Sequence, residues 1–247
     1  MKRRVDDIGF GGLKLVQDED AFCYGTDAVL LANMACRELQ ITEDMRVCDL
    51  GTNTAVIPLI MSARCSAKEI VGVEVQEQAF ELAQENLKLN SLRDRLKLVL
   101  ANVKDIKGME SQLLGAESFD VVTTNPPYME SGRGLVSGNT AKAIARHELL
   151  AGLEEFLEAA AFLLKDGGSL FMVHRPGRLI DICEASRRFA LEPKTIQLVS
   201  GKPGGVPNIL LMHFVKGGRR QLKWLENISV RNEDGSFTKE VLEAYEA

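Results

Sequence analysis

Four consecutive residues, Asn125, Pro126, Pro127 and Tyr128, have the types and the order needed to hold a planar amino group. The side-chain carbonyl of Asn125 and the backbone carbonyl of Pro126 form an acceptor pair for the two amino hydrogens, which aims the nitrogen lone pair at an incoming electrophile. The ring of Tyr128 offers a flat surface for a nucleobase, an interaction worth about 1–3 kcal/mol. A strand that simply ends in a proline-rich turn is the structural alternative. The tetrapeptide predicts chemistry at an exocyclic amino or amide nitrogen.

A strand must deliver this tetrapeptide to a binding crevice. Residues 119–124 read FDVVTT, an apolar run, and the two prolines that follow stop a strand at Asn125 because proline cannot donate a backbone hydrogen bond. In an open parallel sheet, ligands bind in the crevice outside the carboxyl ends of the strands. We therefore expect Asn125 to face a ligand.

A second strand and turn, DLGTNTAVIPL from Asp49, resemble a nucleoside-binding turn. Such a turn would place glycines at the positions of Gly51, Asn53 and Ala55, and only the first is present. Asn is the other residue type that most readily takes a left-handed conformation, at a cost of about 1 kcal/mol, and Ala55 adds a single methyl. The Asn53 side chain would either intrude on the ligand or donate a hydrogen bond to it.

The strand EIVGVEV places Glu74 where an acidic residue accepts hydrogen bonds from both ribose hydroxyls, about 20 residues after the turn. A carboxylate there favours free ribose hydroxyls over a 2′-phosphate, which it would repel. A solvated glutamate at the start of a helix is the alternative. After the next strand, Asn102 is positioned to contact an adenine edge, with Asp105 as the nearby acidic alternative.

Apolar runs alternate with segments of helical period, which predicts a mostly parallel sheet with helices on both faces. The expected strands are residues 46–50, 70–75, 96–100, 119–124, 169–174, 195–200 and 209–215, and the expected helices are residues 27–37, 55–63, 76–89, 147–164 and 177–189. Gly and Pro in LVSGKPGGVPN predict an antiparallel hairpin between the last two strands. A short helix is expected from Thr238, capped there or at Ser236. The fold class is α/β, a Rossmann-like seven-stranded sheet.

The order and spacing of several stretches resemble those of the Asn-Pro-Pro-Tyr methyltransferases that act on tRNA adenine N6, the family of the tRNA1(Val) adenine-N6 methyltransferase. The resemblance runs over nearly the whole chain and is carried by FCYGTDAVLLANMA, DLGTNTAVIPLI, GVEVQEQAFELAQENLKLN, FDVVTTNPPY, AIARHE and HRPGRLIDI. It implies S-adenosylmethionine as the cofactor and the tRNA adenosine beside the anticodon as the target.

Residue by residue, the resemblance gives Asn125, Pro126 and Tyr128 the amino-group and base-stacking roles and lines the cofactor with Thr26, Asp27, Asp49, Gly51, Asn53, Glu74 and Asn102. Thr26 and Asp27 look like a segment that folds over the methionine end, although a capped helix start explains them as well. Related chains usually carry Asp where this one has Asn102. That departure and the glycine-poor turn both lie on the cofactor side.

The expected organisation is an N-terminal hairpin and helix over the cofactor site in residues 1–40, a methyltransferase core in residues 41–217 and a short C-terminal appendage in residues 218–247. The 247 residues suffice for one sizeable core. The loop in residues 131–145 lies directly behind the tetrapeptide and is a candidate binding loop or lid.

Charge is unevenly spread along this acidic chain of net charge -5. Residues 131–224 hold 14 Lys or Arg and 8 Asp or Glu, hence 14 - 8 = +6, whereas residues 225–247 hold 2 and 6, hence 2 - 6 = -4. The basic half is suited to a phosphate backbone, although a solvated surface explains it equally well. Together with the lack of a large N-terminal domain, it favours RNA over the main alternative, glutamine-N5 methylation of a protein. A non-catalytic RNA-binding scaffold with a degraded cofactor turn is the third interpretation.

No apolar run approaches the roughly 18 residues of a membrane span, so a soluble, cytoplasmic protein without a membrane partner is expected. The five cysteines have no Cys-x-x-Cys pair and are expected to be reduced. No metal site is expected among the three histidines: His213 is interpreted as a core or edge residue of a strand, His174 as a strand end, and His147 as a helix start or an RNA contact. The sequence does not define the oligomeric state.

Overall fold

The computed structural model describes residues 3–18, 24–128 and 151–246. The expected loop in residues 131–145, His147 and Cys23 lie outside the described residues. The strands of the main sheet are β3 (Arg46–Leu50), β4 (Glu69–Glu74), β5 (Leu96–Leu100), β6 (Phe119–Thr124), β7 (Leu164–His174), β8 (Leu191–Ser200) and β9 (Ile209–Lys216). The helices that cover it are α1 (Thr26–Glu38), α2 (Val56–Arg64), α3 (Glu77–Leu89), α5 (Leu153–Leu163) and α6 (Leu179–Arg188).

The sheet confirms the predicted fold class. Its strands lie in the order β5-β4-β3-β6-β7-β9-β8. Among these described strands, β9 alone runs in the opposite direction to the rest. Two strands of two residues each, β10 (Lys223–Trp224) and β11 (Ile228–Ser229), extend the sheet by pairing with the outer edge of β8. They are too short to carry a recognisable pattern, and the sequence did not predict them.

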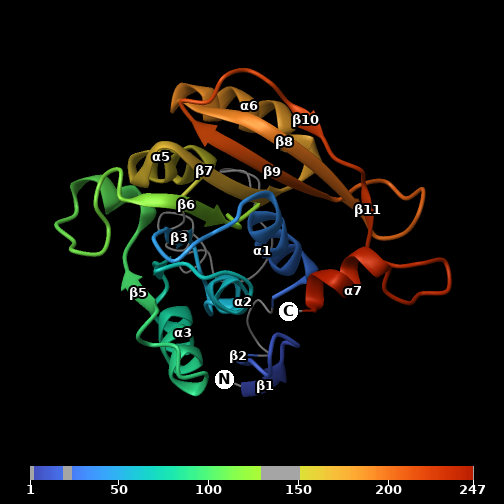
Figure 1. Cartoon of the computed structure of the whole chain (residues 1–247), viewed down its shortest axis with the longest axis horizontal. Helices are drawn as coiled ribbons and strands as arrows, with labels where there is room; N and C mark the ends of the chain where they lie inside the picture. Colours follow the sequence, from blue (N-terminus) through green and yellow to red (C-terminus); the bar gives the residue numbers. More distant parts are fainter. Residues whose placement is uncertain (1–2, 19–23, 129–150, 247) are drawn as a thin grey trace, which may run out of the picture.

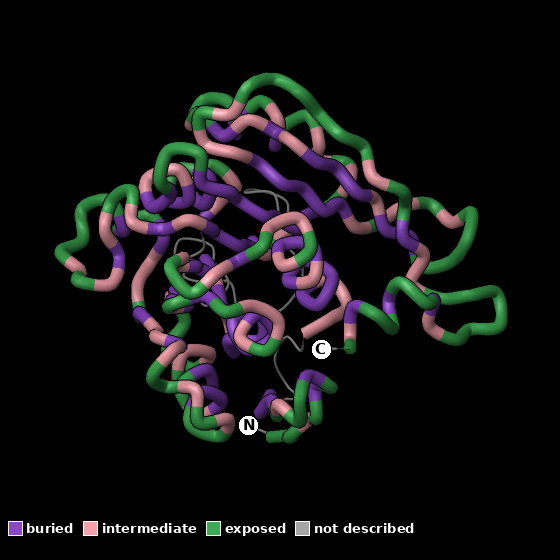
Figure 2. The backbone as a smooth tube through the Cα atoms, in the orientation of Figure 1, coloured by how far each residue is buried: buried purple, intermediate pink, exposed green. Residues whose placement is uncertain are grey.

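Two hydrophobic clusters fill the two faces of the sheet because successive strand residues point to opposite sides. Val47, Ile70 and Val121 pack with α1, α2 and α3, and Cys48 and Val71 pack with α5 and α6 on the other face. Figure 1 shows these two layers of helices, and Figure 2 shows the buried strands between them.

The N-terminal strands β1 (Arg3–Asp7) and β2 (Lys14–Asp18) form a separate antiparallel hairpin that lies beside α3 (Figure 1). At the other end of the chain, α7 (Lys239–Tyr245) packs against α1 and buries Val241 and Ala244 in the same cluster as α1. Thr238 takes the N-cap position of α7, as predicted. The domain boundaries near residues 40 and 217 stay predictions, since α1 and α7 share one core.

Asn86 of α3 ties the hairpin to the rest of the molecule. Its side chain is fully buried, accepts from the Val16 amide at 2.6 Å, and donates to the carbonyls of Val16 and Thr54 at 3.1 and 3.0 Å. The amide therefore pairs with β2 as a neighbouring strand would, and it also holds the turn that follows β3. The helical pattern of α3 gave no signal for this contact.

We expect Asn86→Ala to lower the free energy of unfolding by about 2–4 kcal/mol, because it leaves buried backbone groups without partners. Asn90→Ala is the matched control: Asn90 bonds the amide and carbonyl of Lys14 one turn later, where water can replace it. Urea unfolding measures both. Equal losses in the two variants would contradict the role given to Asn86.

Within the described ranges, no helix combines the length and the apolar character needed to cross a membrane.

Candidate functional site

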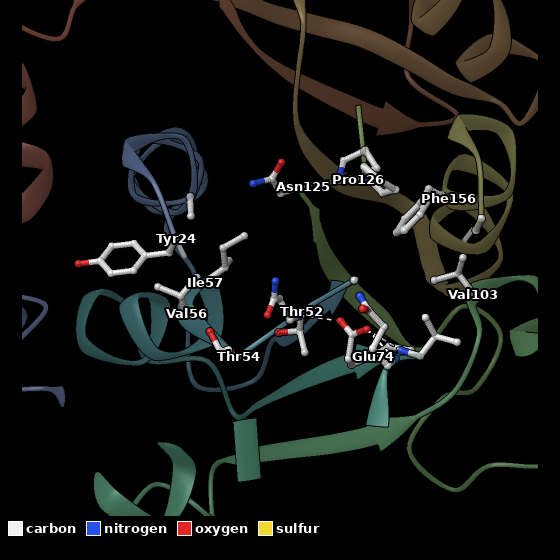
Figure 3. A pocket seen from close by; sticks show the side chains of 18 of the residues that line it. Tyr24, Thr52, Thr54, Val56, Ile57, Glu74, Val103, Asn125, Pro126 and Phe156 are labelled. Carbon is white, nitrogen blue, oxygen red and sulfur yellow. Dashed lines mark hydrogen bonds between the residues drawn. The ribbon is translucent and has the colours of Figure 1, made fainter. Parts of the chain in front are cut away.

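A cavity of about 460 Å³ opens at the carboxyl ends of β3, β4 and β6. This volume lies within the range of small-molecule sites, roughly 300–1,000 Å³. Figure 3 shows its walls, which come from the start of α1, the turn after β3, the end of β4, the tetrapeptide and α5. The cavity brings together eight of the predicted site residues, namely Asp27, Gly51, Asn53, Glu74, Asn102, Asn125, Pro126 and Tyr128.

The turn after β3 adopts the backbone of a glycine-rich turn although it contains a single glycine. Gly51, Asn53 and Ala55 all have positive φ, at 71°, 52° and 65°. A Cβ atom at position 51 would lie 3.2 Å from the Phe156 ring, so both the positive φ and the close approach favour glycine there. The three positions are those where the sequence predicted glycines, and the fold imposes the left-handed conformation on Asn53 and Ala55.

Backbone amides fix the carboxylate of Glu74 in the floor of the cavity. Oε2 accepts from the Asn53 amide at 2.8 Å, and Oε1 accepts from the amides of Val75 and Gln76 at 2.9 and 2.8 Å. Four lone-pair sites on a carboxylate exceed these three donors, which leaves room for a ligand hydroxyl. Glu74 thus links the turn to the end of β4 while lining the cavity (Figure 3).

Asp49 lies beneath the turn, outside the lining of the cavity. It is fully buried; the Thr123 hydroxyl donates to its Oδ1 at 2.6 Å, and its Oδ2 has no hydrogen-bond partner among the described residues. Asp49 pairs in register with Gly72 and Thr123, which puts all three on one face of the sheet. Gly72 leaves space for Thr52, whose Oγ1 would lie 3.0 Å from a Cβ at that position. Burial raises the pKa of Asp49 to about 7.

The raised pKa of Asp49 predicts a pH-dependent stability. The folded protein holds the proton more tightly than the unfolded chain, whose pKa is about 3.9, so the contribution is present at low pH and is lost as the pH rises towards 7. Between pH 5 and pH 8 the free energy of unfolding should fall by about 2–3 kcal/mol relative to Asp49→Asn, which keeps the acceptor for Thr123. Urea unfolding at both values measures the difference, and parallel pH profiles for the two proteins would refute it.

Asn102 lines the cavity and caps a short 3₁₀ helix, η1 (Val103–Gly108), by accepting from the Lys104 amide at 3.1 Å. Asp105, its acidic alternative, is exposed and does not line the cavity. Thr26 is the first residue of α1 and does not line the cavity either, whereas its neighbours Gly25 and Asp27 do. The cofactor roles of Thr26 and Asn102 stay predictions.

At the end of β6, Asn125, Tyr128 and Asp27 form one hydrogen-bonded cluster. The Asn125 Nδ2 donates to Asp27 Oδ2 at 3.3 Å, and the Tyr128 hydroxyl lies 2.7 Å from Asn125 Oδ1 and 3.1 Å from Asp27 Oδ2. Burial, with the Asp27 charge as the next cause, raises the pKa of Tyr128 above its ordinary value, so its phenol stays protonated. Asp27 reaches this cluster from α1, on the opposite side of the cavity from α5.

The sequence missed two residues that hold the Tyr128 ring. His174, at the end of β7, packs edge-on against it with ring centroids 5.2 Å apart, and the Arg175 guanidinium lies 4.6 Å from the ring centroid. The Arg175 amide donates to His174 Nδ1, and burial lowers the histidine pKa to about 4, so the ring is neutral near pH 7. The motif HRPGRL, which contains both residues, could have indicated these contacts, because β7 lies beside β6 and the end of β7 meets the tetrapeptide.

Among the described residues, no group of three His, Cys, Asp or Glu side chains is arranged to hold a metal ion. His213 is a core residue, as predicted: it stacks on Phe171 and lies 3.0 Å from the Ser169 hydroxyl. The described cysteines, Cys36, Cys48, Cys65 and Cys183, are free thiols.

Known proteins similar to this chain are methyltransferases. A curated relative from Bacteroides thetaiotaomicron, named tRNA1(Val) (adenine(37)-N6)-methyltransferase, is 30% identical over 80% of this chain and 78% of its own length. A relative of the same name from Porphyromonas gingivalis is 28% identical over 85% and 81%. A solved structure of a predicted O-methyltransferase from Agrobacterium tumefaciens has the same fold, with a TM-score of 0.66, 22% identity, and coverage of 90% of this chain and 97% of the other.

The family model described as the methyltransferase small domain matches residues 13–178. The matched range contains the turn after β3, Glu74, the tetrapeptide and the ends of the strands that form the cavity. The chain belongs to the methyltransferase small domain family.

Proposed function

We propose that this methyltransferase transfers a methyl group from S-adenosylmethionine to N6 of an adenine in tRNA, at the adenosine beside the anticodon. The observation that carries the proposal is a single cavity in which Asn125, Pro126 and Tyr128 face the turn after β3 and Glu74. The printed names of the curated relatives support adenine in tRNA as the acceptor.

The cofactor half of the cavity suits a nucleoside that carries a charged tail. Glu74 offers a preoriented carboxylate for ribose hydroxyls, and the positive φ of Gly51 brings backbone close to the ligand without a side chain. The buried Thr52 in the same turn also lines the cavity, and its hydroxyl is a polar group within reach of the same molecule. These residues fit S-adenosylmethionine.

The acceptor half of the cavity suits a planar amino group. When bound, S-adenosylmethionine supplies a methyl group on a sulfonium, which is electrophilic without a metal. Asn125 Oδ1 and the Pro126 carbonyl accept the two amino hydrogens and turn the nitrogen lone pair towards that methyl. The amino nitrogen would attack that methyl in line without prior full deprotonation, the methyl–sulfur bond would break, and S-adenosylhomocysteine would leave as a neutral thioether. The proton would leave afterwards to the acceptors or to solvent. Positioning supplies most of the rate in this scheme.

The base must leave its stack to reach Asn125, which costs least in a single-stranded loop. Tyr128 is the stacking surface in this scheme, and Arg175 beside it is an exposed cation that can pair with a phosphate of the RNA. The net positive charge of residues 131–224 in the sequence supports an RNA partner. A tRNA acceptor places the reaction in the cytoplasm.

The test is mass mapping of modified nucleosides in RNA from a strain that lacks this protein. N6-methyladenosine beside the anticodon should disappear from one tRNA and return with the wild-type gene. In vitro, labelled S-adenosylmethionine is offered with unmodified tRNA and, separately, with a release factor. Label in glutamine of the protein would instead assign amide methylation. If calorimetry detects no heat of binding with millimolar S-adenosylmethionine, the result would favour a non-catalytic RNA-binding protein over an enzyme.

A further inference from the structure

Asp27 holds the reactive end of the tetrapeptide although it lies 98 residues away in the chain. It stands in the first turn of α1, where its Oδ1 accepts from the Ala28 amide at 2.9 Å. A Cβ on Gly25 would lie 2.9 Å from the same Oδ1, so the glycine leaves the carboxylate its place. One oxygen is therefore anchored to the helix, and the other faces Asn125 and Tyr128.

The chemistry of the partners fixes the orientation of the Asn125 amide. A carboxylate can only accept, whereas a side-chain amide has a donating end and an accepting end of nearly equal size. Asp27 Oδ2 thus selects the orientation in which Nδ2 points to α1 and Oδ1 accepts from the Tyr128 hydroxyl, which leaves the second lone pair of Oδ1 for a substrate. Figure 3 shows the Asn125 nitrogen directed towards the helix coloured blue, α1. A flipped amide would point its oxygen at the carboxylate.

We infer that Asp27 is a positioning residue of the methyl transfer, which orients Asn125 so that its Oδ1 accepts the substrate amino group and keeps the Tyr128 hydroxyl beside it. The inference rests on the proposed function and adds a residue to its acceptor side. It also separates Asp27 from the cofactor role that the sequence resemblance implied. A residue that acts through Asn125 changes the transfer rate, whereas a cofactor ligand changes the affinity for S-adenosylmethionine.

The decisive experiment exchanges the two partners. Asn125→Asp sets two carboxylates against each other, and one of them must take up a proton. The double variant with Asp27→Asn and Asn125→Asp restores a donor on α1 and an acceptor on β6, with the wild-type net charge. Single-turnover rates are measured with the full chain, unmodified tRNA and saturating S-adenosylmethionine. Asn125→Asp should lower the single-turnover rate by about 10³-fold, and the double variant should be at least about tenfold faster than Asn125→Asp.

Two further variants define the role of Asp27. Asp27→Ala should slow transfer by about 30- to 100-fold at saturating cofactor, with the calorimetric affinity for S-adenosylmethionine within about twofold of wild type. Glu240→Gln is the matched control, an exposed acid in the first turn of α7, and should leave rate and affinity unchanged. Weaker cofactor binding by Asp27→Ala, with an unchanged rate at saturation, would make Asp27 a cofactor ligand and overturn the inference.

Urea unfolding of the wild type, Asn125→Asp, Asp27→Asn and the double variant gives a readout that needs no substrate. The double variant should regain the stability that Asn125→Asp loses, since the pair is restored. If the exchange regains neither rate nor stability, Asp27 does not orient Asn125. A wild-type protein that methylates no tRNA would defeat the proposed function, while the unfolding cycle would still decide the contact.

Discussion

Asn125→Ala is expected to lower the single-turnover rate of tRNA methylation by about 10²–10³-fold while leaving the affinity for S-adenosylmethionine close to that of the wild type. The substitution removes the side-chain acceptor that aims the amino lone pair, and loss of one preorganised hydrogen-bonding group at a reacting centre typically has this cost. In the proposed site, Glu74 and the turn after β3 hold the cofactor, whereas the hydrogen bonds described for Asn125 join it to Asp27 and Tyr128.

The fold should tolerate this change, because the Tyr128 hydroxyl retains Asp27 Oδ2 as an acceptor when the amide is removed. Asn232→Ala, in the exposed turn before α7, is a control of the same residue type and should have wild-type activity. Rates are compared by rapid quench with protein in excess over unmodified tRNA. An Asn125→Ala protein that still methylates at the wild-type rate would remove Asn125 from the mechanism.

Glu74→Gln should weaken S-adenosylmethionine binding by about 100-fold and also lower the free energy of unfolding by about 1–3 kcal/mol. The substitution looks conservative, yet three backbone amides point at this carboxylate, two at Oε1 and one at Oε2. A glutamine side chain has one accepting end. Whichever way it turns, its NH₂ group meets at least one backbone donor, and the turn at Asn53 loses its partner when the oxygen takes the Oε1 position.

Calorimetry and urea unfolding measure the two effects of Glu74→Gln separately. Glu77→Gln, three residues later in the exposed first turn of α3, is the matched control and should change neither. At saturating cofactor the transfer rate of Glu74→Gln should approach that of the wild type, which distinguishes it from Asn125→Ala. Wild-type affinity in Glu74→Gln would show that the carboxylate does not bind the ribose.

The glycine-poor turn illustrates how far local sequence reasoning reaches. The positions that need a left-handed backbone follow from the strand-turn-helix order, and Gly51, Asn53 and Ala55 all have positive φ in the structure. The effect of the substituted side chains on ligand binding does not follow from that order. It depends on the walls of the cavity, which come from α1, α5 and the tetrapeptide as well as from the turn.

The sequence by itself determined the seven principal strands, their helices and the places of Glu74 and Asn125 at strand ends. These follow from apolar periodicity and proline chemistry, which act between near neighbours in the chain. Only the tertiary structure decided that Asp27 meets Asn125, that His174 and Arg175 hold Tyr128, and that Asn86 pairs with β2. Such contacts depend on how α1, α3 and β7 dock, because a hydrogen bond requires placement to within a few tenths of an ångström. No local pattern encodes a distance between residues that lie 98 positions apart.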